Sequence, residues 1–159
     1  MLRSFLFGLV AGQRGITPLA SVAIATYRRE IPVTLPLQHL MLSPVVTGGA
    51  AALAAAEMAG DKMKSAPDRI VPIGLAVRAI TSAYAGAAVA PKGQQAMGAV
   101  VAMSTALLSS YVGWSLRMAA MRRYGQTPTG LVEDALVLGA GMAVTNPNLL
   151  DSKALTHRR

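Results

Sequence analysis

The chain has 159 residues, of which 53% are hydrophobic and only 14% are charged, whereas a soluble domain has about 25% charged residues. This composition excludes a disordered chain and a disulfide-rich secreted scaffold, and the absence of cysteine excludes thiolate catalysis and thiol-ligated metals. The formal net charge is +8, but the basic residues are scattered and form no stripe with aromatic residues, so we expect no nucleic-acid partner.

Long runs without charge predict membrane helices. Neither Ile31–Ala56 nor Gly93–Leu116 contains Asp, Glu, Lys or Arg, and a spanning helix needs about 20 mostly apolar residues. We therefore predict an all-α, polytopic helical membrane protein in which residues 1–150 form one membrane domain and residues 151–159 form a cationic tail. About five membrane segments are expected: Phe5–Tyr27, Leu40–Ala56, Ile73–Ala90, Met97–Leu116 and Leu131–Thr145.

The first of these segments is expected to be kinked or broken. Arg14 interrupts its apolar run, and Gly12, Gly15 and Pro18 surround that charge. A proline removes a backbone donor and clashes with the preceding turn, and a broken helix is tolerated in lipid only where protein or a watery cavity covers it. We interpret Phe5–Tyr27 as an uncleaved segment that crosses once, which places the N-terminus on the opposite side from Arg28.

Small residues recur at helical spacing in three of the segments. Gly48–Ala56 is almost entirely Gly and Ala, and both Gly86-x-x-x-Ala90 and Gly139-x-x-x-Ala143 have the small-x-x-x-small pattern. Such faces let helix backbones approach closely. They predict close packing, either inside the chain or in a homo-oligomer or larger membrane complex.

Ionisable residues within or beside the apolar segments are the candidate site residues. A charge at the bilayer centre costs about 2.5–3.5 kcal/mol on insertion scales, so such side chains should face inward and pair. The cations are Arg14 and Arg78, and the available anions are Glu57, Asp61, Glu133 and Asp134.

Two stretches carry a resemblance to a known family. They are Glu57-Met-Ala-Gly-Asp61-Lys62-Met63-Lys-Ser-Ala-Pro67-Asp-Arg69, followed by Arg78, and Gly12-Gln-Arg14-Gly-Ile-Thr17-Pro18. They resemble a family of small bacterial integral membrane proteins of unknown function, whose pattern is close to E-x-x-x-D-K-L-P-x-x-P-x-R. Lys64 replaces a proline of that pattern. Gly113 with Arg117, and Val132-Glu133-Asp134-Ala135, resemble its later elements.

The resemblance implies a polytopic protein of the bacterial inner membrane with no established activity. Its motifs coincide with the charges singled out above and so favour one inward-facing network, with Thr17 and Pro18 at the helix break. The network residues are Arg14, Glu57, Asp61, Lys62, Arg69 and Arg78.

Two functions fit these observations. In the first, the protein is a small transporter or a lipid-interacting protein, and its network binds a polar or anionic group. In the second, it is a structural or accessory subunit of a larger complex, and the same pairs brace the helices. The expected partners are membrane lipids and either further copies or other subunits. His39 and His157 have no metal-ligand spacing, so we expect no metal, cofactor or enzymatic activity.

Overall fold

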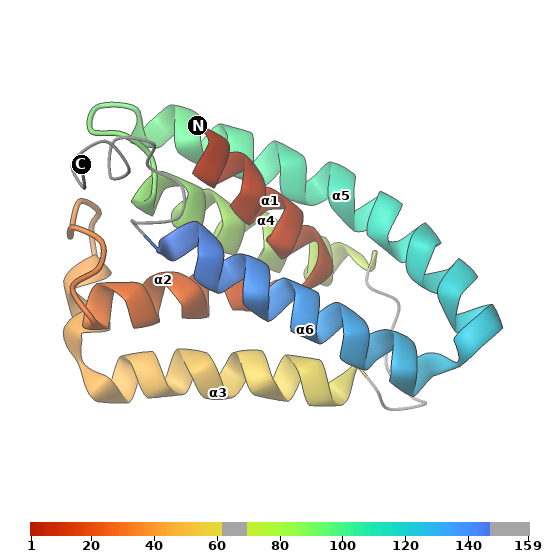
Figure 1. Cartoon of the computed structure of the whole chain (residues 1–159). Helices are drawn as coiled ribbons and strands as arrows, with labels where there is room; N and C mark the ends of the chain where they lie inside the picture. Colours follow the sequence, from red (N-terminus) through yellow and green to blue (C-terminus); the bar gives the residue numbers. More distant parts are fainter. Residues whose placement is uncertain (62–69, 147–159) are drawn as a thin grey trace, which may run out of the picture.

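The computed structural model describes residues 1–61 and 70–146. Helices without strands make up the regular structure of these residues, so the all-α fold is confirmed (Figure 1). The predicted tail, residues 151–159, lies outside the described residues. The elements in chain order are α1 (Leu2–Gln13), α2 (Thr17–Tyr27), the 3₁₀ helix η1 (Gln38–Leu42), α3 (Pro44–Gly60), α4 (Pro72–Ala88), α5 (Gln95–Tyr124) and α6 (Gln126–Thr145).

The predicted break in the first segment is present. Helix α1 ends before Arg14, whose backbone is extended (φ −138°, ψ 115°), and α2 begins at Thr17. Pro18 lies in the first turn of α2, where a missing N–H leaves no helical hydrogen bond unmade. The proline therefore favours a new helix start after the break.

The two halves of the broken segment fold back on each other, which corrects the prediction of a single crossing. Figure 1 shows α1 running away from the N-terminus and α2 returning toward the same end of the bundle. Met1 lines the same cavity as Pro32 and Lys92, so the N-terminus lies beside the residues that follow α2 and α4. The apolar run was long enough for one span, but it did not reveal that the chain reverses at Arg14.

The remaining helices run along the bundle in alternating directions (Figure 1). Among the described residues, α5 is the only helix that is long and apolar enough to cross a membrane. Helices α3 and α4 have 17 residues each, or about 26 Å, and α6 contains Glu133 and Asp134 within its 20 residues. The expected topology of five spans is therefore not supported.

Close packing through glycine is found at one of the three predicted faces. Gly86 of α4 lies against Ala102 and Gly98 of α5, and a Cβ at Gly86 would lie 2.5 Å from the carbonyl oxygen of Gly98. In contrast, a Cβ at Gly48 or Gly139 would meet no atom within 4 Å. Gly48 of α3 and Gly139 of α6 are thus not explained by packing within the described chain, whereas Gly141 of α6 lies against Ser21 of α2.

Candidate functional site

The break between α1 and α2 places Arg14 inside the bundle, where the guanidinium binds two carboxylates. Its Nε and Nη2 donate to Oδ1 of Asp134 at 2.8 and 2.6 Å, and its Nη1 donates to Oδ2 of Asp61 at 2.7 Å. Only 1% of Arg14 is exposed. An arginine stays protonated in proteins, so the two carboxylates provide the negative charge that a buried cation requires.

A second arginine, Arg117 of α5, shares these partners. Its Nη1 lies 2.5 Å from Oδ2 of Asp61 and 2.7 Å from Oε2 of Glu133, and its Nη2 donates to the carbonyl oxygen of Asp61 at 3.2 Å. The Asp61 carboxylate therefore lies between two guanidinium groups. We call the set Arg14, Asp61, Arg117, Glu133 and Asp134 the arginine cluster.

The arginine cluster joins the α1–α2 break to the C-terminal end of α3, to α5 and to α6. Two positive side chains face three negative ones, so the charges nearly cancel within a part of the bundle where screening by water is small. Arg117 is 8% exposed and Asp134 7%. Pairs of this kind are costly to break because removing one partner leaves an uncompensated buried charge.

Glu57 satisfies the backbone of the break. Its two carboxylate oxygens accept hydrogen bonds from the N–H groups of Gly15 at 2.7 Å and Ile16 at 2.9 Å. The carbonyl oxygen of Gly15 accepts a hydrogen bond from Thr81 Oγ1 at 2.6 Å. A carboxylate is favourable at a helix N-terminus, where the N–H groups lack helical partners. Glu57 thus occupies the position at which the start of α2 could hold an external anion.

The structure brings together most of the predicted site residues. Arg14, Asp61, Glu133 and Asp134 are in the arginine cluster, and Glu57, Thr17 and Pro18 lie at the break. Arg78 is buried, and its Cγ lies 3.2 Å from the position of a Cβ on Gly15. Lys62 and Arg69 lie outside the described residues.

Sequence reasoning did not include Arg117 among the site residues. Arg117 directly follows the charge-free run that ends at Leu116, so its position alone indicates a charge that flanks a membrane segment. The available signal was the Gly113-x-x-x-Arg117 spacing. In the structure, Gln13 of α1 packs against Gly113, so the glycine gives α1 room beside α5, one turn from the arginine.

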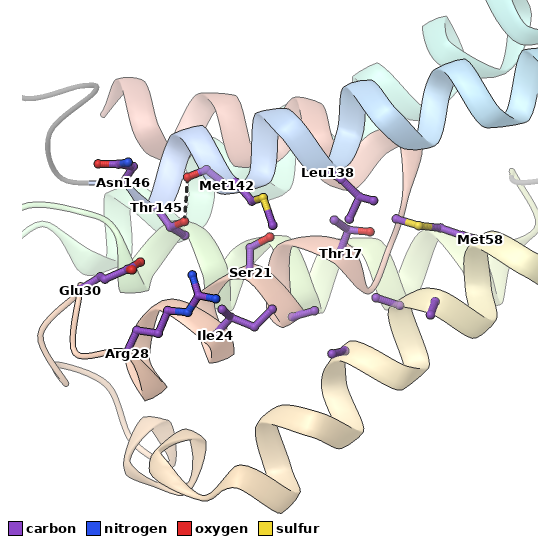
Figure 2. A pocket seen from close by; sticks show the side chains of 14 residues that line it. Thr17, Ser21, Ile24, Arg28, Glu30, Met58, Leu138, Met142, Thr145 and Asn146 are labelled. Atoms are coloured by element: carbon purple, nitrogen blue, oxygen red, sulfur yellow. Dashed lines mark hydrogen bonds between the residues drawn. The ribbon is translucent and has the colours of Figure 1, made fainter.

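A groove lies beside the arginine cluster, between α2, α3 and α6 (Figure 2). It has a volume of about 390 Å³, which is within the usual range for small-molecule sites of about 300–1,000 Å³. Ala51, Ala55, Met58, Leu138 and Met142 are among its apolar walls. We call it the α2 groove, because α2 forms its floor.

Polar side chains follow the floor of the α2 groove. Thr17, Ser21 and Arg28 line it from α2 and the residue after it, and Glu30 and Asn146 line it near Arg28. Thr17 is 1% exposed, and within the described structure its hydroxyl has no hydrogen-bond partner. A buried hydroxyl without a partner costs about 1–3 kcal/mol, so the groove contains an unsatisfied polar atom.

Metal binding receives no support from the arrangement of the acidic residues. In residues 1–61 and 70–146, no group of three or more His, Cys, Asp or Glu side chains is placed to hold a metal ion. The three acids of the arginine cluster instead face guanidinium groups.

Comparison with known proteins gives no match: the chain matches no protein-family model, no curated protein and no solved structure. The resemblance described above therefore stays a prediction, and the function is inferred from the geometry of the chain itself.

Proposed function

We propose that this chain is a membrane-embedded, lipid-interacting protein of the bacterial inner membrane, with the arginine cluster as an internal brace. The observation that carries the proposal is an inverted distribution of polarity. Between the two ends of the bundle, the described charged side chains are buried or partly buried, whereas many large apolar side chains are exposed.

The outer faces of the helices are apolar over most of their length. Leu53 of α3, Ile80 of α4, Leu108 of α5 and Leu136 of α6 are 62 to 71% exposed. In the same helices, as far as Met121 in α5, every charged side chain is buried or partly buried. Exposed apolar surface of this extent marks a surface that contacts lipid or another protein.

Within residues 1–61 and 70–146, exposed charges are confined to the two ends of the bundle. Arg28, Arg29, Glu30 and Lys92 lie at the end that holds the N-terminus, and Arg122 and Arg123 lie where α5 ends (Figure 1). Charged side chains at both ends of an apolar band fit a bilayer, whose headgroup regions accept them. Helix α5, about 45 Å long at 1.5 Å per residue, is the helix that would cross it.

The geometry favours a lipid-interacting protein over a transporter that binds an anion at Arg14. Three donors of the Arg14 guanidinium are directed at Asp61 and Asp134, and Glu57 covers the N-terminus of α2. These groups satisfy one another, as expected for a brace that keeps a broken helix stable in lipid.

Cysteine labelling tests the proposal, because the natural chain contains no cysteine. Leu53→Cys, Leu108→Cys and Leu136→Cys would be made one at a time and treated in native membranes with a water-soluble maleimide. All three should resist labelling until the membrane is dissolved, whereas the control Lys92→Cys should react at once. Rapid labelling of the three leucine positions in intact membranes would overturn the proposal.

A second candidate, an accessory subunit of a membrane complex, is favoured by the unpacked glycines. Gly48, Gly49 and Gly139 face open space, although such residues usually serve close helix contacts. Purification in mild detergent separates the candidates: a fixed stoichiometry with unrelated subunits supports the accessory role, and a chain that elutes alone or with copies of itself supports the first proposal.

A further inference from the structure

We propose that the α2 groove binds a membrane phospholipid, with its phosphate at Arg28 and its acyl chains along α3 and α6. This inference rests on the proposed membrane location and names the lipid-binding site within it. Four polar side chains of the groove, those of Thr17, Ser21, Arg28 and Glu30, are unpaired within the described residues.

Thr17, Ser21 and Arg28 follow one face of α2 and its end, at positions i, i+4 and i+11. The side chains of Ser21, Arg28 and Glu30 make no hydrogen bond or ion pair within residues 1–61 and 70–146, and the Thr17 hydroxyl is orphaned although Thr17 is 1% exposed. Figure 2 shows Arg28 extending alongside Ile24 and Ser21 rather than away from the groove. The groove therefore offers a row of polar groups that a ligand can satisfy.

The order of these groups matches a phospholipid. Arg28 and Glu30 lie at the charged end of the bundle, where headgroups would be, and the row extends about 16 Å along α2 to Thr17. A phospholipid presents a phosphate, then ester carbonyls, then acyl chains. The guanidinium of Arg28 would bind the phosphate, and the hydroxyls of Ser21 and Thr17 would donate to the ester carbonyl oxygens.

The apolar walls of the groove suit the acyl chains of the phospholipid. Ile24, Met58, Leu138 and Met142 provide apolar contacts, and Ala51 and Ala55 leave room along α3. Glu30, beside Arg28, supplies a negative partner for an ammonium group. The two charged side chains that line the groove, Arg28 and Glu30, therefore complement a zwitterionic headgroup, of which phosphatidylethanolamine is the bacterial example.

The test measures the lipid that the full chain retains. The protein would be purified in mild detergent, exchanged into a defined mixture of phosphatidylethanolamine and phosphatidylglycerol, washed, and analysed by lipid mass spectrometry. Ala55→Leu fills the groove, and its matched control Ala52→Leu adds the same bulk to the exposed face of α3 outside the groove. We expect Ala55→Leu to lose most of the retained lipid and Ala52→Leu to retain the wild-type amount.

Three polar variants locate the headgroup and the ester region. Arg28→Gln should lower retention about tenfold, the size expected for losing a hydrogen bond to a charged group, whereas Arg29→Gln should not. Glu30→Gln should remove the preference for phosphatidylethanolamine. Thr17→Val keeps the side-chain shape, so it should reduce retention while the protein stays folded.

The possible negative results distinguish failure of the groove proposal from failure of the membrane proposal. If the leucine positions are protected in membranes but Ala55→Leu and Ala52→Leu retain equal lipid, the groove proposal is wrong and the membrane proposal stands. Equal retention by Arg28→Gln and Arg29→Gln would likewise overturn the placement of the phosphate. If the leucine positions label freely, both proposals fail together.

Discussion

The carboxylate of Glu57 accepts a hydrogen bond from the backbone N–H of Ile16 at 2.9 Å, so the last turns of α3 close the first turn of α2. The contact joins residues 41 positions apart in the chain and completes a helix end that begins in the interior of the bundle. It makes the broken first segment compatible with an apolar environment, because its N–H groups do not depend on water.

Glu57→Gln should therefore destabilise the fold. The amide has one acceptor oxygen in place of two and no charge, so one of the bonds to Gly15 and Ile16 is lost and the other weakens. We expect a loss of about 1–3 kcal/mol, measured by denaturant unfolding in detergent. Arg122→Gln, at an exposed position outside the groove, is the control and should change stability by less than about 0.5 kcal/mol. Equal effects of the two variants would contradict the capping role.

The arginine cluster predicts that the stability of the fold depends strongly on the balance of charge among its five side chains. Arg117→Met removes one cation and leaves Asp61 and Glu133 facing each other, with an expected cost of about 3–5 kcal/mol. Adding Glu133→Gln to that variant removes the excess negative charge and should restore part of the loss. Unfolding of both single variants and the double variant gives the coupling energy, and Arg122→Gln provides an exposed control. A coupling energy near zero would show that the two side chains do not act together.

With the proposed membrane location, the folded-back first segment predicts on which side of the membrane each end of the bundle lies. Single cysteines at Arg3, Arg29 and Lys92 should all label from one side, and a cysteine at Arg123 should label from the other. Membrane vesicles of known orientation and an impermeant maleimide make the measurement. Labelling of Arg3→Cys and Arg29→Cys from opposite sides would mean that α1 and α2 together form one crossing.

Sequence reasoning found the helical class and most of the charged residues that meet, because both follow from local rules. A buried charge requires a partner, and few cations and anions lie in apolar segments, so Arg14 could be expected to pair within a small set of anions that includes Asp61 and Asp134, although residue types alone did not select these two. The break at Arg14 was also predicted, since glycine and proline mark it.

The direction of the chain after the break could not be predicted. It depends on contacts between distant residues, such as Thr81 with the carbonyl of Gly15, and hydropathy contains no such information. The same is true of Glu57, which was expected to pair with an arginine and instead binds backbone amides. The α2 groove was not foreseen either, because it exists only where three helices that are separate in the chain come together.

Two glycines provide a matched test of packing in α4 and α6. A Cβ at Gly86 would lie 2.5 Å from the carbonyl of Gly98, and a Cβ at Gly139 would meet nothing within 4 Å. Gly86→Ala should therefore destabilise the chain by about 1–3 kcal/mol through overpacking. Gly139→Ala should leave it unchanged or stabilise it by up to about 1 kcal/mol, because alanine is the better helix former.

Thermal unfolding in detergent measures the stability of both glycine variants. The same stability measured in native membranes shows whether the effect of each variant depends on the membrane. If Gly139 only faces lipid, Gly139→Ala should be neutral or stabilising in native membranes as well. If Gly139 is instead a contact for another membrane helix, Gly139→Leu should leave the isolated chain stable in detergent and reduce co-purification of its partner. The difference between the isolated and the membrane-bound protein then decides whether Gly139 of α6 contacts another membrane helix.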